Sequence, residues 1–291
     1  MLKLSKKIDF VMFITVKKAN PNGDPLNGNR PRTDYEGFGE ISDVCIKRKI
    51  RNRLIDFGEH VFVQSNDKRV DEFNSLKERA KSNVDLVKAD KDGDEKGYAR
   101  AACSEWIDVR SFGQLFAFAK DAKDKGKGVS IGIRGPVSIH TAVSIEPLTY
   151  SSMQITKSVN SEPTKDNGKS SDTMGMKHRV DFGVYRLQGS MNPQLAELTG
   201  FSDNDAETIK EALISLFEND ASSARPEGSI EVNKIYWFEH SSKIGQYSSA
   251  KVHRSVDIRR KLDVVTPLSF DDYDCVVSEL DGLHVNIYNG L

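Results

Sequence analysis

The chain has 291 residues, of which 37% are hydrophobic and 29% charged, a composition typical of a folded globular protein and not of a disordered one. A formal net charge of −1 would argue against a nucleic-acid partner, but the charges are segregated. Residues 1–53 hold twelve Lys or Arg against six Asp or Glu, and 243–261 hold six against one, whereas 202–231 and 262–291 are strongly acidic. One surface could therefore attract a polyanion, or meet the acidic surface of another copy.

The sequence gives no sign of a metal, a cofactor or a membrane span. Cys45, Cys103 and Cys275 form no C-x-x-C pair, which favours reduced thiols in the cytoplasm over disulfides. The six histidines show no zinc-binding spacing, so we expect no metal site and no cofactor. No segment approaches the ~20 apolar residues of a membrane-spanning helix, and we expect a cytoplasmic protein without a membrane partner.

The first predicted element is a strand over 8–16, and it leads into the segment that carries most of the functional argument. Eleven of the twenty residues in 20–39 are Gly, Pro or Asn, types that let backbone amides approach a ligand closely. A helix capped by Ser42 or Asp43 follows. Loop amides, a helix N-terminus and guanidinium groups together suit phosphate, although a solvated helix behind a structural loop has equal weight. The basic residues of this helix are Lys47, Arg48, Lys49, Arg51 and Arg53.

Helical spacing separates the core-facing side of this helix from its cations. The apolar stripe consists of Ile46, Ile50, Leu54 and Phe57. On steps of 100°, three cations lie off that stripe and are expected to project together, namely Lys47, Arg48 and Arg51.

The next segments predict a short strand, helices and then further strands. We expect a short strand over 61–64, an amphipathic helix over 73–87 and an exposed loop over 88–97. A buried helix is predicted over 106–119, interrupted at Gly113. Alternating residues predict strand over 129–145, with a break at Gly135-Pro136.

The segment 150–179 is rich in Ser, Thr, Lys, Asn and Gly and has few aliphatic anchors, so it predicts a protruding arm. A strand over 180–188, a helix starting near Ser202 and a strand over 230–238 follow. A hairpin is predicted over 275–288, around Asp281-Gly282. The summed order predicts an α+β domain with an RRM-like (ferredoxin-like) sheet and helices on one face.

Several groups have side chains that could take part in catalysis. Four carboxylates near the basic loop, Asp24, Asp34, Glu36 and Asp43, could suggest metal-assisted or general-base chemistry on bound RNA, but carboxylates beside arginines more often orient them. His178 and His253 each precede an arginine and could serve as RNase acid or base, or as stacking and hydrogen-bonding contacts. The stretch 167–171 resembles a phosphate-binding P-loop, yet Pro163 stands where that motif needs glycine, which excludes a nucleotide triphosphatase of this type.

Four segments together resemble the backbone subunit of the CRISPR surveillance complex Cascade, in its type I-C version, within the RAMP superfamily. They are ANPNGDPLNGNRPRTDYEGFGEISDVCIKRKIRNRL at 19–54, SFG at 111–113, IRGPVSI at 133–139 and TMGMKHRVDFGVYRLQGSMNP at 173–193. The resemblance covers most of the chain in the right order. It implies a single RRM-like RAMP domain over 1–291, with a helical fingers insertion at 60–125 and a thumb insertion at 150–180.

The resemblance also implies the partners and the contacts. Many copies would stack head-to-tail along one guide crRNA, beside other Cascade subunits, and present the guide's bases to a target DNA strand in antiviral defence. Such a subunit should hold backbone and shape, and leave sequence to base pairing. The expected RNA contacts are Asn27, Asn29, Arg30, Arg32, Lys47, Arg48, Lys49, Arg51, Arg53, Arg134, Met174, Lys177, His178, Arg179, Lys251 and Arg254.

The type I-C resemblance implies a non-catalytic scaffold and not an enzyme, and two rival functions stand against it. Related backbone subunits of type III complexes cut RNA with a loop aspartate, for which Asp24 or Asp34 would be the candidate. A protein-only filament, in which a basic surface binds the acidic tail of the next copy, is the other.

Overall fold

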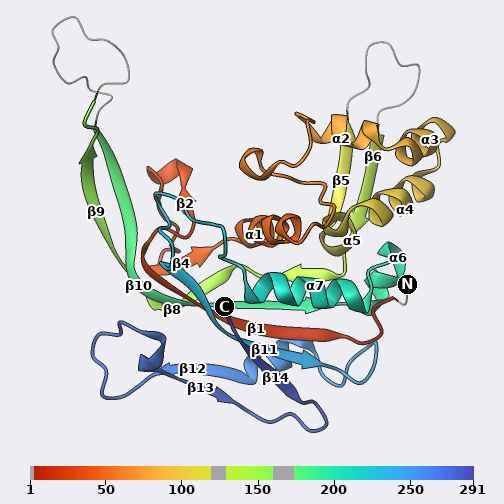
Figure 1. The fold of residues 1–291 in the computed structure, drawn as a ribbon. Coiled ribbons are helices and arrows are strands. Elements are labelled where there is room, and N and C mark those ends of the chain that lie inside the picture. The colour runs from red at the N-terminus through yellow and green to blue at the C-terminus, as the bar shows by residue number, and fades with distance from the viewer. Residues whose placement is uncertain (1–2, 119–128, 160–173) are drawn as a thin grey trace, which may run out of the picture.

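The computed structural model describes residues 3–118, 129–159 and 174–291. Its centre is an eight-stranded antiparallel sheet with the main order β14-β11-β1-β10-β8-β4, while β7 and β9 also pair with β10 (Figure 1). The apolar part of strand β1, near the centre of the sheet, is buried, which fits a position between two layers. The strands are β1 (Ile8–Ala19), β4 (Phe38–Ile41), β7 (Val137–Ile139), β8 (Ala142–Pro147), β9 (Thr149–Thr156), β10 (Met174–Met191), β11 (Ile230–Glu239) and β14 (Val285–Asn289).

Different layers cover the two faces of this sheet. Helices α1 (Asp43–Asp56), α6 (Pro193–Thr199) and α7 (Asp203–Ile214) lie on one face, over the largest core cluster. Helix α8 (Ser249–Arg254) and a two-stranded sheet of β12 (Val256–Arg260) and β13 (Tyr273–Val277) cover the other face. The two faces can therefore meet different partners.

A third group of elements, which we call the finger layer (59–118 and 129–134), stands above α1 (Figure 1). It has its own core, in which the rings of Phe62 and Phe116 lie 5.0 Å apart and those of Phe62 and Trp106 lie 4.6 Å apart. Its elements are a 3-10 turn (Asn66–Lys68), α2 (Leu76–Ser82), α3 (Val84–Asp92), α4 (Glu95–Glu105), α5 (Ile107–Phe112), β5 (Gly113–Phe118) and β6 (Val129–Arg134).

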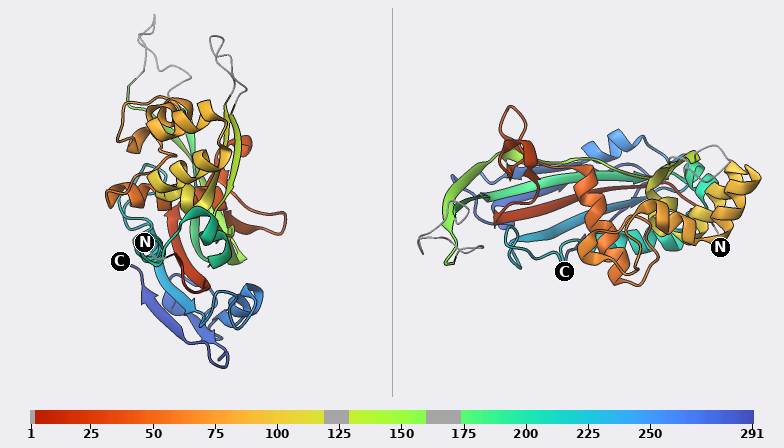
Figure 2. Two further views of the ribbon diagram at one scale, coloured as in Figure 1. Left: turned by 90° about the vertical axis from the view of Figure 1, so that its right-hand side faces the viewer. Right: turned by 90° about the horizontal axis from the view of Figure 1, so that it is seen from above.

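We call β9 together with residues 174–180 of β10 the arm. Figure 2 shows the arm and the finger layer at opposite ends of the sheet. The middle of the predicted arm, 160–173, lies outside the described residues, and so does the P-loop-like stretch 167–171. No helix among the residues that the structure describes is long and apolar enough to cross a membrane.

Several sequence predictions are confirmed. The first strand, the α1 helix with its Ser42 cap, the break at Gly135-Pro136 and the capping box between Ser202 and Asp205 are all present. These features depend on short-range signals, which explains why the sequence alone could locate them.

Five predictions are wrong, each because of a contact or a cap that the pattern did not reveal. Residues 61–64 form no strand, since the N–H groups of Phe62 and Val63 donate to Asp108. The helix over 73–87 is two helices divided at Asn83, and 88–97 is largely helical. Gly113, with φ 79°, ends α5 and begins a strand. The hairpin over 275–288 does not form, because β13 pairs with β12 and β14 pairs with β11.

Candidate nucleic-acid interface

The loop 20–39, which we call the N-terminal loop, contains regular secondary structure and lies between the arm and α1 (Figure 1). It contains β2 (Gly23–Asp24), a 3-10 turn (Pro25–Asn27), β3 (Arg30–Pro31) and the start of β4. Gly28 and Asn29 both have left-handed backbones, with φ of 59° and 58°. Asn20 Nδ2 donates to the carbonyl oxygen of Asn29 at 2.8 Å, and this hydrogen bond fixes the turn at Gly28 and Asn29. The loop can present its residues to a partner without first being ordered.

Four predicted RNA contacts gather on this loop. Asn27 and Asn29 are exposed, and the guanidinium of Arg30 donates to Asn27 Oδ1 at 3.2 Å. Arg32 lies 3.6 Å from the carboxylate of Asp24, and its Nε is buried without a hydrogen-bond partner among the described residues. Two amide side chains beside two guanidinium groups form a surface that suits phosphate and sugar oxygens.

The cations of α1 do not form the surface that the sequence predicts. Lys49 is 4% exposed and pairs with Asp220, and burial lowers its pKa. Arg53 Nε donates to Ser215 Oγ at 3.0 Å and its Nη1 to Asp56 at 2.8 Å. Arg51 Nε lies 2.8 Å from the buried carboxylate of Asp108. These three cations therefore form contacts within the protein that stabilise its fold.

The other two cations of α1 are more exposed to solvent. Arg48 is exposed and lies 3.0 Å from Asp67, while Lys47 is partly exposed and lies 3.0 Å from Asp43. The prediction that Lys47, Arg48 and Arg51 project together is therefore wrong for Arg51. Its guanidinium turns toward a carboxylate that is distant in the sequence.

The arm divides its predicted contacts between two faces. In the β9–β10 ladder, Met174 lies opposite Thr156 and His178 lies opposite Ser152. Because side chains alternate along a strand, Met174 and His178 share one face, and Lys177 and Arg179 share the other. Met174 points to the same side of β10 as Val180, and Val180 packs in the core beneath α1. The exposed methionines of the arm, Met174 and Met176, are 58% and 56% exposed.

The remaining predicted contacts lie away from the N-terminal loop. Arg134 is exposed at the end of β6, in the finger layer. Lys251 and Arg254 are exposed on α8, which packs on the sheet face opposite to α1. The structure thus does not bring these two α8 residues together with Asn27, Asn29, Arg30 and Arg32.

The groups considered for catalysis have structural roles. Asp24 Oδ1 accepts from the N–H of Leu26 at 3.2 Å, and Asp34 Oδ1 accepts from Glu36 and Phe38, both at 2.9 Å. His178 is buried beside Ser152 Oγ, at 2.7 Å.

His253 belongs to a buried polar cluster. Its Nε2 lies 2.9 Å from the carbonyl oxygen of Gly189 and 3.9 Å from Asp9, which itself lies 2.8 Å from His240. Burial lowers the pKa of His253. It is therefore not exposed as an RNA contact.

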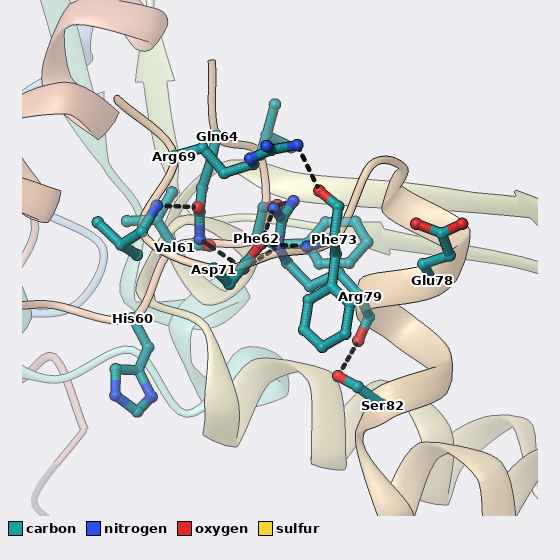
Figure 3. Close-up of polar contacts among 12 residues, drawn as sticks. His60, Val61, Phe62, Gln64, Arg69, Asp71, Phe73, Glu78, Arg79 and Ser82 are labelled. Atoms are coloured by element: carbon teal, nitrogen blue, oxygen red, sulfur yellow. Dashed lines mark hydrogen bonds and ion pairs between the residues drawn. The ribbon is translucent and has the colours of Figure 1, made fainter. Parts of the chain in front are cut away.

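The finger layer borders a pocket of about 490 Å³, and Figure 3 shows the polar contacts among residues that line it. Arg79 lies at its wall and is 4% exposed. Its guanidinium contacts both oxygens of Asp71, at 2.6 and 2.7 Å, and donates to the carbonyl oxygen of Phe62 at 2.7 Å. The hydrogen bond from Arg79 lowers the pKa of Asp71. This charge pair stabilises the layer internally and needs no ligand to satisfy it.

Sequence reasoning missed two exposed apolar residues of the N-terminal loop. Leu26 is 98% exposed and Tyr35 is 96% exposed. Their signal was available, because each is a large apolar side chain inside a segment dominated by Gly, Pro and Asn.

Comparisons with known proteins give a consistent result. The model of a family described as CRISPR-associated protein Cas7 matches residues 6–278. A relative, the CRISPR-associated protein Cas7 of Haloferax volcanii, is 28% identical over 214 residues, covering 69% of this chain and 61% of the relative. The chain thus matches about three-fifths of the length of that relative.

Two solved structures resemble the fold. A chain of a CRISPR RNA-guided surveillance complex in a pre-nicking state has a TM-score of 0.44 and 16% identity, over 80% of this chain and 78% of that chain. A chain of a second CRISPR RNA-guided surveillance complex has a TM-score of 0.37 and 15% identity, over 80% of this chain and 68% of that one.

Proposed function

Because the chain belongs to the family of the CRISPR-associated protein Cas7, we propose that it is a backbone subunit of an RNA-guided CRISPR surveillance complex and holds the guide crRNA. The observation that carries this proposal is the preorganised N-terminal loop, on which Asn27, Asn29, Arg30 and Arg32 lie together beside the arm. A single-stranded polyanion would gain ion pairs and hydrogen bonds there at little cost in ordering.

Within this proposal, the sheet and its two long helices form an RRM-like palm. The central order β11-β1-β10-β8, with α1 and α7 on one face, supports that assignment. The finger layer corresponds to the fingers and the arm to the thumb. The type I-C subtype rests on the sequence resemblance alone, and a cytoplasmic location rests on the spacing of the three cysteines.

We extend the RNA surface from the loop to Lys47, Arg48 and Arg134, and to the arm residues Met174, Lys177 and Arg179. Lys49, Arg51 and Arg53 would support this surface from within the protein. The partners would be the guide crRNA, further copies of the chain arranged head-to-tail, other Cascade subunits and, through the guide, a target DNA strand.

We propose that the subunit does not cleave RNA. The two aspartates that a nuclease mechanism would use, Asp24 and Asp34, already accept backbone hydrogen bonds that define the loop. A carboxylate fixed in a turn is poorly placed to take a proton from a substrate hydroxyl.

The proposal is tested with labelled single-stranded RNA and the intact protein in a native gel. Retarded, full-length RNA is expected, whereas shortened RNA would support a nuclease and an unshifted band would overturn RNA binding. The double variant Arg30→Ala/Arg32→Ala should bind more weakly, with a log–log salt slope reduced by ~0.7 for each lost phosphate contact. Arg100→Ala, at an exposed arginine of α4, is the matched control.

A further inference from the structure

Besides its polar groups, the N-terminal loop presents two large apolar side chains to solvent. Leu26 stands on the 3-10 turn at 98% exposure, and Tyr35 stands on the following turn at 96% exposure. Both lie in the segment that carries Arg30 and Arg32, one before them and one after them in the sequence.

The turn that carries Leu26 is fixed in place. Asp24 caps it by accepting from the N–H of Leu26, and the N–H of Asn29 donates to the carbonyl oxygen of Asp24 at 2.8 Å. A Cβ added at Gly23 would lie 2.0 Å from Asn29 Oδ1, so the two sides of the turn are in close contact. These contacts fix the backbone from which the Leu26 side chain extends.

The turn that carries Tyr35 is fixed in the same way. Asp34 accepts from two backbone N–H groups of this turn, and Gly37, with φ 88°, supplies the left-handed position. The N–H of Leu148 donates to the carbonyl oxygen of Gly37 at 2.9 Å. Since β9 begins at the next residue, Thr149, this turn is tied to the base of the arm.

We propose that Leu26 and Tyr35 contact the faces of RNA bases, so that the N-terminal loop grips the guide by base stacking as well as by its phosphates. The inference rests on the proposed function. A tyrosine ring stacks on any base, because every base has a π-face, and an apolar side chain can wedge between neighbouring bases. Such contacts are independent of sequence, as a subunit that serves any guide requires.

RNA is the occupant that the loop itself favours. Apolar side chains interleaved with arginines and amides match a single strand, in which each phosphate lies next to a base. A protein partner would more often cover a continuous apolar patch than two residues separated by cationic and amide groups.

The test measures affinity for two probes, a fluorescent oligouridylate and an abasic oligomer of the same length. Tyr35→Ser should weaken binding of the oligouridylate by about 5- to 150-fold, the range expected for loss of one base stacked on an aromatic ring, and Leu26→Ser should weaken it as well. Neither should change binding of the abasic oligomer or the salt slope, because no phosphate contact is lost. Tyr35→Phe should retain most of the affinity.

Leu198→Ser is the matched control, since Leu198 is 74% exposed on α6. Equal losses on both probes, or wild-type affinity in both serine variants, would overturn the inference. Light scattering of the protein with RNA measures assembly of the copies. If the serine variants keep their RNA affinity but scatter less light, the two residues belong to contacts between copies instead. A wild-type protein that binds neither probe would overturn the proposed function, and this inference with it.

Discussion

Arg51 and Asp108 join helix α1 to the finger layer through a buried ion pair, with 2.8 Å between Nε and Oδ2. The same carboxylate accepts from the backbone N–H groups of Phe62 and Val63. Two residues further along α5, Arg110 lies 2.8 Å from Asp205 of α7. The short helix α5 thus anchors the finger layer to α1 and α7, the two long helices that cover one face of the sheet.

Arg51→Ala should destabilise the protein by about 3–5 kcal/mol, because it leaves the Asp108 carboxylate buried without its cation. Arg48→Ala, at an exposed pair on the same helix, should cost only about 0–1 kcal/mol. Chemical denaturation of the two variants measures the difference. Equal stabilities would show that the ion pair does not anchor the layer.

Gly135→Ala should also destabilise the junction between α5 and the finger strands. A Cβ at this position would lie 2.2 Å from the carbonyl oxygen of Ser111 and 2.4 Å from the nitrogen of Gly113, both backbone atoms. Such overpacking typically costs about 1–3 kcal/mol. Gly132→Ala is the control, since a Cβ there meets no atom within 4 Å. Thermal melts should separate the two, and a Gly135→Ala melt matching that of Gly132→Ala would contradict the close approach.

The two faces of the arm should respond differently when RNA binds. If the face of Met174 and Met176 covers the guide, bound RNA should slow the oxidation of both methionines by peroxide, which mass spectrometry of the peptides measures. Lys177→Ala/Arg179→Ala should lower the salt slope without changing that protection. Methionines oxidised at the same rate with and without RNA would place the guide elsewhere.

The stability of the protein should fall as the pH drops below 6.5, the ordinary pKa of histidine, because burial lowers the pKa of His253. In that range the unfolded chain binds a proton that the folded chain excludes, so the free energy of unfolding decreases until the folded-state pKa is reached. The groups facing His253 are Asp9, His140 and Arg186.

Thermal melts across a pH series measure this effect. His253→Gln can keep a donor for the Gly189 carbonyl oxygen and should flatten the dependence below pH 6.5. His284→Gln, at an exposed histidine, should leave it unchanged. A His253→Gln curve parallel to the wild-type curve would rule out His253 as the source.

The sequence predicted those parts of the fold that depend on local chemistry. The apolar run of β1, the Ser42 cap and the capping box at Ser202 need only their neighbours in the chain. The hairpin over 275–288 was predicted from an equally local turn, but the choice of partner strand is a tertiary property and each strand joined another sheet.

The candidate site shows the same division. The N-terminal loop could be identified because its composition determines what its backbone can do. The cations of α1 could be counted, but Arg51 is paired with a residue 57 positions away, which no helical periodicity reveals. The exposure of Leu26 could have been inferred from the composition of its segment, whereas the contacts that fix its turn, such as the hydrogen bond to Asp24, are visible only in three dimensions.

The alternation of side chains along the arm limits how its length can change. Met174 and Met176 lie on one face of the arm, and Lys177 and Arg179 lie on the other. Adding or removing one residue in a strand between the sheet and Met174 would exchange these two faces. Length variants that keep both faces in place must therefore gain or lose residues in even numbers per strand. Insertions of one residue should be tolerated only where a bulge absorbs them, as at the register shift between Val180 and Phe182.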